Sequence, residues 1–154
     1  MKKILFAALS YGAGALGALA MRGKGSPRSV WFKTLRKPSF QPPNRVFGPV
    51  WMALYGAIAY SGYRIYRSAP SRERTVALGL WGAQMILNGM WTPIFFRGHK
   101  PRAALADMIA LDATSAAYTA VAARVDKPAA AAFVPYLGWL GFATALNAKI
   151  VAKN

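Results

Sequence analysis

Aromatic and amide side chains recur on one helical face in each of three apolar segments. They form three groups: Trp51 and Tyr55; Asn88, Trp91 and Phe95; and Tyr136 and Trp139. Within each group the residues are three or four positions apart, a spacing that places side chains on one face of an α-helix. Aromatic walls with a few polar groups are typical of sites for flat apolar ligands, so the three faces could enclose one pocket. The alternative is that the rings pack between helices or lie at the two surfaces of a bilayer.

The ionisable residues of the apolar segments offer little catalytic chemistry. Asp107 and Asp112 are five positions apart, or about 140° around a helix, which is too divergent for an acid–base pair. Asp112 lies nearer the middle of its segment and is either a hydrogen-bond partner between helices or a functional residue. Asp107 is close enough to the basic turn at 97–102 to pair with it. The chain has one histidine, His99, and no cysteine, so we expect no metal site.

Long uncharged segments position these residues. Four segments contain no Lys, Arg, Asp or Glu, namely 4–21, 46–63, 75–96 and 128–148, and a fifth, 103–123, carries only the two aspartates. Each is long enough to cross about 30 Å of hydrocarbon as a helix. The sequence therefore predicts an all-α, multi-pass integral membrane protein in one domain, 1–154. Its five transmembrane helices are expected at approximately 3–22, 44–67, 72–97, 101–124 and 128–150.

The strong positive charge has two interpretations. A formal net charge of +16 and a pI near 10.9 fit a nucleic-acid-binding protein. Four long uncharged segments are not expected in a basic soluble domain. Short basic loops between membrane spans, in contrast, are common. We therefore expect no nucleic-acid partner. Lys2 and Lys3 before an apolar run also fit a secretion signal. We expect a retained helix because an aromatic loop, rather than a soluble domain, follows it.

The residues between the first two predicted helices form a structured capping loop, 23–43. Pro38, Pro42 and Pro43 prevent a regular helix there, because each removes a backbone donor and restricts the residue before it. Apolar rings alternate with cations in this loop, which suits a segment that folds its rings onto a neighbouring surface. Of the 20 Lys and Arg residues, 12 lie on the side of this loop and of the C-terminus. The bias predicts that the C-terminus faces the cytoplasm.

Three blocks of sequence resemble the signature blocks of the translocator protein family, which includes TspO, the tryptophan-rich sensory proteins and the peripheral benzodiazepine receptor. They are WFKTLRKPSFQPPNRVFGPVWMALY at 31–55, QMILNGMWTPIFF at 84–96 and PYLGWLGFATALN at 135–147. The resemblance implies a five-helix bundle, often a homodimer, in which the first loop caps a pocket. It also implies that the pocket binds porphyrins such as protoporphyrin IX and haem, and in animal members cholesterol.

By position, the resemblance implies these pocket residues: Trp31, Trp51, Tyr55, Asn88, Phe95 and Trp139. Some bacterial relatives are reported to degrade porphyrin with light, and the two tryptophans implicated there match Trp51 and Trp139. The chain departs from the family where Ala148 and Lys149 replace two tyrosines of the animal cholesterol motif, and Ser39 replaces an aromatic residue of the loop. Recognition of a sterol by that segment is therefore not expected from the motif.

Cations near the predicted pocket mouth fit the acidic propionates of a tetrapyrrole. They are Arg28, Lys33, Arg36, Lys37 and Arg45. The alternative partner for these cations is the layer of lipid headgroups. We therefore expect a membrane protein that binds a tetrapyrrole for sensing, transport or regulated disposal, with no obligatory cofactor. The alternatives are a sterol or lipophile carrier, a light-dependent porphyrin-degrading enzyme, and a structural protein that only packs in the bilayer.

A pair of small residues suggests how two copies associate. Gly79 and Ala83 are four positions apart on the third predicted helix, turned about 140° from the face of Asn88 and Trp91. Small residues at this spacing let two helices approach closely in lipid. We expect a homodimer through this face. Ala13 and Gly17 on the first helix offer a rival surface, and packing within the bundle is the alternative use of both pairs.

Overall fold

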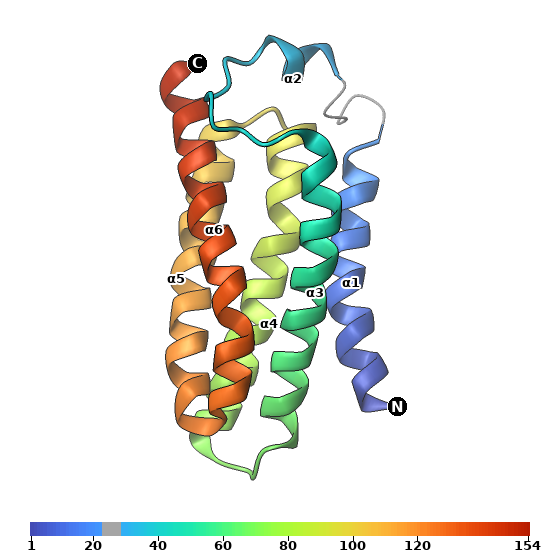
Figure 1. The fold of residues 1–154 in the computed structure, drawn as a ribbon, viewed down its shortest axis with the longest axis vertical. Coiled ribbons are helices and arrows are strands. Elements are labelled where there is room, and N and C mark those ends of the chain that lie inside the picture. Colours follow the sequence, from blue (N-terminus) through green and yellow to red (C-terminus); the bar gives the residue numbers. More distant parts are fainter. Residues whose placement is uncertain (23–28) are drawn as a thin grey trace.

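The computed structural model describes residues 1–22 and 29–154, which form an elongated helical bundle (Figure 1). Its long helices are α1 (Lys2–Ala20), α3 (Asn44–Arg67), α4 (Arg72–Thr92), α5 (Pro101–Val125) and α6 (Lys127–Lys153). A short helix, α2 (Val30–Thr34), lies across one end of the bundle, and a π-helical turn, η2 (Pro93–Arg97), continues α4. The described ranges contain no strand. The predicted all-α class is confirmed.

The helices pack around a buried aromatic and aliphatic core. Helix α5 contacts both α4 and α6, whereas α1 lies against α3 and α4. Close approach depends on Gly62 of α3, where an added Cβ would lie 2.5 Å from Trp81 Nε1 and 2.9 Å from the ring of Phe6. Trp81 is fixed by its indole N–H, which donates to the Ile58 carbonyl at 3.0 Å. The half of the bundle away from α2 is therefore tightly packed.

Two parts of the structure differ from the predicted boundaries. The loop predicted at 23–43 contains one helical turn, α2, because Ser29 accepts a hydrogen bond from Phe32 N and caps its start. Residues 23–28, with the predicted mouth residue Arg28, lie outside the described residues. The helix predicted at 72–97 is α-helical only to Thr92, since Pro93 lacks the donor for a regular helix and the next turn becomes η2.

The number of membrane spans is not confirmed. By length and hydropathy, one helix within the two described ranges, α6, is apolar enough on its own to cross a membrane. A single such helix is weak support for an integral membrane protein. The five-span arrangement stays a prediction.

Candidate ligand-binding cavity

A cavity of about 650 Å³ lies in the half of the bundle that is covered by the lid, our name for residues 29–43. Helices α1, α3, α4, α5 and α6, the turn η2 and the lid all contribute to its wall. The residues that line it include Tyr11, Gly14, Phe32, Gln41, Asn44, Phe47, Trp51, Met52, Tyr55, Asn88, Trp91, Phe95, Phe96, Met108, Leu111, Trp139, Leu146, Asn147 and Ile150. The wall is mainly apolar, and none of the lining residues within 1–22 and 29–154 carries a charge.

Aromatic rings from three helices form much of this wall. The ring of Trp51 lies 5.3 Å from that of Tyr55 and meets Trp139 edge to face at 6.5 Å. The rings of Trp91 and Phe95 stack at 5.1 Å with an interplanar angle of 19°. Six of the eight predicted ligand-binding residues therefore lie around one space, namely Trp51, Tyr55, Asn88, Trp91, Phe95 and Trp139. An apolar wall lined by aromatic rings suits a flat apolar ligand.

A chain of hydrogen bonds links three helices at the base of the cavity. Tyr55 O–H donates to Asn88 Oδ1 at 2.9 Å, and Asn88 Nδ2 donates to Tyr136 Oη at 2.8 Å. Tyr136 O–H then donates to Gln84 Oε1 at 3.1 Å. Tyr136 is fully buried and does not line the cavity, so it supports Asn88 from behind. Because Asn88 is engaged on both sides by the protein, it helps to fix the positions of Tyr55 and Tyr136.

The lid is anchored by aromatic contacts to η2. Phe32 is buried, with its ring 5.3 Å from Phe96 and 6.3 Å from Phe95. Trp31 stacks on the exposed His99 at 4.3 Å and meets Phe95 at 5.6 Å. Trp31 is therefore a lid anchor outside the cavity wall, and Phe32 is the lid ring that lines the cavity.

The end of α6 also holds the lid. Arg36 N donates to Asn154 Oδ1 at 2.9 Å, and Asn154 Nδ2 donates to the Arg36 carbonyl at 3.0 Å and to the Ile150 carbonyl at 2.8 Å. Lys153 Nζ reaches the Lys37 carbonyl at 3.4 Å. Sequence reasoning missed this clamp. No sequence pattern signals it, since the paired residues are 118 positions apart.

Four of the predicted mouth cations, Lys33, Arg36, Lys37 and Arg45, do not line the cavity. Lys33, Arg36 and Arg45 are exposed, and Lys37 Nζ is used within the lid, where it donates to the Phe32 carbonyl at 2.6 Å. The polar side chains that the lid side contributes to the wall are the neutral amides of Gln41 and Asn44. Whether these four cations meet a ligand at the mouth stays a prediction. Lys33, Arg36 and Arg45 keep their side chains at the exposed surface, where charge is cheaply solvated.

Sequence reasoning also missed the contribution of α1. Gly14 lies so close to Tyr55 that an added Cβ would be 2.5 Å from its ring. Tyr11 donates to the Met52 carbonyl at 3.1 Å and lines the cavity as well. The small residues of the first apolar segment were the sequence signal that could have indicated this close approach.

Other predicted residues take structural positions. Asp112 accepts a hydrogen bond from Thr144 Oγ1 at 2.6 Å, which joins α5 to α6. Asp107 forms no ion pair with the basic turn in the described part of the chain, and one of its carboxylate oxygens is buried without a partner there. Gly79 and Ala83 lie on the exposed face of α4, away from the cavity.

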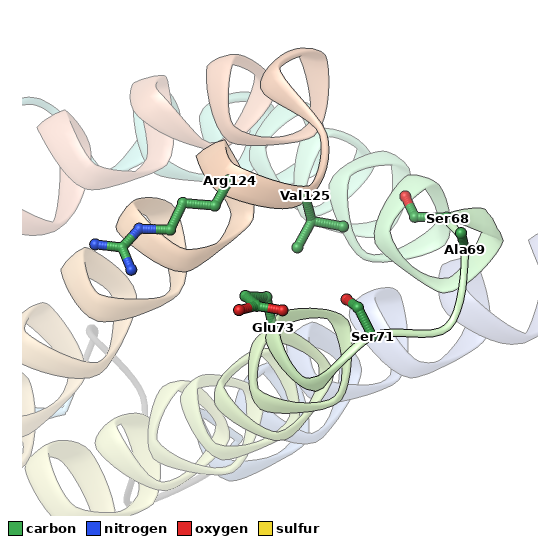
Figure 2. Close-up of a pocket in the computed structure, with 6 residues that line it drawn as sticks. All are labelled: Ser68, Ala69, Ser71, Glu73, Arg124 and Val125. Atoms are coloured by element: carbon green, nitrogen blue, oxygen red, sulfur yellow. The ribbon is translucent and has the colours of Figure 1, made fainter.

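A second hollow, of about 350 Å³, lies at the end of the bundle opposite the lid (Figure 2). It is lined by Ser68, Ala69, Ser71, Glu73, Arg124 and Val125. Ser71 is already used there as the N-cap of α4, where it accepts from Arg74 N at 3.0 Å, and Arg124 extends away from the serines. The large aromatic cavity is the better candidate site because it is deeper and its walls come from every long helix.

Comparison with known proteins agrees with the resemblance of the three sequence blocks. The sequence matches the family model of the TspO/MBR family over residues 6–152. Translocator protein of Bos taurus is 37% identical over 143 residues, which cover 92% of this chain and 83% of the relative. Translocator protein of Homo sapiens is 40% identical over 126 residues, covering 80% and 75%. Tryptophan-rich protein TspO of Chlorobaculum tepidum is 34% identical over 155 residues, covering 99% and 98%. The chain therefore belongs to the TspO/MBR family of membrane-associated proteins.

Proposed function

We propose that this protein spans the membrane several times and binds a tetrapyrrole, such as protoporphyrin IX or haem, in the lidded cavity. The observation that carries the proposal is the cavity of about 650 Å³, whose described lining residues are uncharged and include Trp51, Trp91 and Trp139. A tetrapyrrole is a flat aromatic ring that would contact these faces. Its role would be in sensing, transport or regulated disposal of the ligand.

The outer surface of the bundle supports a bilayer environment. Large apolar side chains point outward from every long helix, including Ile4, Leu5, Leu9, Leu16, Met52, Tyr60, Val76, Ile86, Met90, Ile109 and Val134. Charged residues gather toward the helix ends and in the connections instead. A soluble protein rarely exposes so much apolar surface, whereas lipid-facing helices require it. The same surface includes Gly79 and Ala83, through which we propose a homodimer.

The uncharged wall also determines how a tetrapyrrole would lie. A carboxylate buried in an uncharged cavity is costly unless it is paired, so the propionates would point out past the lid. The exposed Lys33 and Arg36 lie in the lid and would meet them there. A neutral lipophile, such as a sterol, needs no such contact, and it is the second candidate because the described part of the wall carries no charge.

The test is a titration of the purified protein with protoporphyrin IX, followed by its Soret band and by quenching of tryptophan fluorescence. We expect saturable binding that Trp51→Leu and Trp139→Leu each weaken by about two- to tenfold, because each loses an aromatic contact. Tyr60→Leu, an aromatic substitution near the other end of α3, is the matched control and should bind as the wild type does. No saturable binding by the wild type, or equal losses in all three variants, would contradict the proposal.

Two extensions of this titration separate the alternatives. A sterol that displaces protoporphyrin IX would show that the cavity accepts neutral lipophiles. Loss of the Soret band under illumination, abolished by the same two tryptophan substitutions, would favour light-dependent degradation over simple binding. For the dimer, Gly79→Leu should shift the protein toward monomer in chemical cross-linking and leave protoporphyrin IX binding unchanged.

A further inference from the structure

Four cations from three helices converge on two tyrosine rings at the end of the bundle opposite the lid. Lys2 Nζ lies 4.7 Å from the centroid of Tyr66, and Arg74 Cζ lies 5.3 Å from the same centroid. Lys3 Nζ and Arg67 Cζ lie 5.6 Å and 5.9 Å from the centroid of Tyr63. We call these four cations and two rings the tyrosine–cation cluster. Helices α1, α3 and α4 all contribute to it.

The charge of the cluster is not balanced by the protein. In residues 1–22 and 29–154 the structure contains one ion pair, between Arg64 and Asp126, which is separate from the cluster. Glu73 follows the start of α4 but lines the second hollow (Figure 2) and pairs with none of the four cations. The tyrosine faces attract the cations, but like charges held this close still repel one another. An anion bound among them would relieve that repulsion.

Two of the cations are held in place and two have free donors. Arg74 donates from Nε and Nη2 to the Tyr66 carbonyl at 3.1 Å and 2.7 Å, and Lys2 Nζ donates to Tyr66 Oη. Lys3 and Arg67 are exposed and donate no side-chain hydrogen bond to other described residues. The fixed pair sets the shape of the cluster, and the free pair can bind an outside acceptor. Ammonium and guanidinium groups together suit the oxygens of a phosphate.

The surface beside the cluster is apolar. Ile4 and Leu5 follow the two lysines on α1 and are 71% and 54% exposed, and Val76 follows Arg74 on α4 and is 44% exposed. Beneath them, Phe6 is buried, with its ring 6.3 Å from Tyr63 and 5.7 Å from Tyr66. A soluble anion would use only the cations. A molecule with a phosphate and a hydrocarbon chain would use both surfaces.

We propose that the tyrosine–cation cluster binds the headgroup phosphate of an anionic phospholipid whose acyl chains run along Ile4 and Leu5. The inference rests on the proposed spanning arrangement, which puts this end of the helices in the headgroup layer, but not on any ligand of the cavity. The bound lipid ties the start of α1 to the end of α3 and the start of α4. It therefore stabilises the packing of α1 on the bundle.

The test uses the detergent-solubilised full chain in mixed micelles with phosphatidylglycerol, with phosphatidylcholine, or with neither. We expect phosphatidylglycerol to raise Tm and to be retained by the wild type. Lys3→Gln with Arg67→Gln removes the free donors and leaves the hydrogen bonds of Lys2 and Arg74 intact, so folding is preserved. Each lost cation should weaken phosphatidylglycerol binding by about fivefold. The matched control is Arg124→Gln with Lys127→Gln, which removes two exposed charges from the same end.

The outcomes are distinct. The inference is supported if phosphatidylglycerol stabilises the wild type and the control pair but not the Lys3 and Arg67 pair. The inference is overturned if the two double variants lose phosphatidylglycerol binding equally, since net charge alone would then explain the binding. An equal effect of phosphatidylcholine, or of inorganic phosphate in lipid-free detergent, also overturns it. Protoporphyrin IX binding by the Lys3 and Arg67 variant should be unchanged, which separates this site from the cavity.

Discussion

Replacing Asn88 by leucine tests whether the hydrogen bonds at the base of the cavity hold its walls together. Leucine has the same branched arrangement of heavy atoms as asparagine but removes the acceptor for Tyr55 O–H at 2.9 Å and the donor to Tyr136 Oη at 2.8 Å. Tyr136 keeps its bond to Gln84, whereas the hydroxyl of Tyr55 loses its partner. The protein therefore loses two hydrogen bonds and gains an unsatisfied hydroxyl.

The size of the effect follows from these losses. A hydrogen bond between helices in a membrane contributes on average about 0.6 kcal/mol, and one in a soluble protein about 0.5–1.5 kcal/mol. Two bonds therefore amount to about 1–3 kcal/mol. Leaving Tyr55 O–H unsatisfied adds about 1–3 kcal/mol, and the greater burial of leucine offsets part of the sum. We expect Asn88→Leu to lower the free energy of unfolding by about 2–4 kcal/mol.

A double-mutant cycle measures the bond between Tyr55 and Asn88 directly. Unfolding would be followed in detergent by circular dichroism for Tyr55→Phe, Asn88→Leu and the double variant. Since the two side chains are in contact, their effects should not add, and the coupling should be about 0.5 kcal/mol or more. If Asn88→Leu costs less than about 0.5 kcal/mol, or if the two changes are additive, the network does not hold the cavity together and the reasoning is wrong.

Three further changes test other parts of the structure. Asn154→Ala removes the clamp on the lid, so amide hydrogen exchange at 31–41 should accelerate while exchange in α5 stays unchanged. Equal exchange rates at 31–41 in the variant and the wild type would show that the aromatic contacts alone hold the lid. Gly62→Ala forces a methyl group against the hydrogen-bonded Trp81 and should lower the free energy of unfolding by about 1–3 kcal/mol, measured as a lower Tm. An unchanged Tm would show that the packing there shifts to accept the methyl group. The arginine partner of Asp126 lowers the pKa of that carboxyl, so its contribution to stability is full above about pH 4 and is lost as the pH falls through the lowered pKa. Asp126→Asn should therefore lower Tm at pH 7 and reduce the further loss of Tm on acidification below pH 4, and equal acid sensitivity in both proteins would contradict this.

The helical part of the cavity was predictable from the sequence because it follows a period. Apolar segments predict helices, and a spacing of three or four residues predicts a shared face. This reasoning brought Trp51, Tyr55 and Asn88 to the same cavity. Asn88 is buried, as is Gln84 one turn before it on α4.

The lid was not predictable in detail because its conformation depends on contacts distant in sequence. Nothing periodic in 29–43 shows that Phe32 turns toward the cavity while Trp31 turns to His99, or that Lys37 is used by the lid itself. From their charge alone, the cations of this loop were predicted to lie at the mouth of the cavity. The lining residues that the structure describes are uncharged, since a cation in an apolar wall would be costly without a ligand to pair with it.

The contacts of the lid have a consequence for ligand entry. Phe32 and Ile150 belong to the same buried cluster and both line the cavity, while the carbonyl of Ile150 accepts from Asn154, which also holds Arg36. A ligand that pushes against the wall at Phe32 and Ile150 therefore acts on both anchors of the lid. Opening past the lid requires the ring of Phe32 to leave its buried position, at a cost of about 1.5–3 kcal/mol, and the Asn154 bonds to break. The geometry favours a lid that stays closed over an occupied or empty cavity and opens rarely, so exchange of the ligand should be slower than its diffusion to the protein.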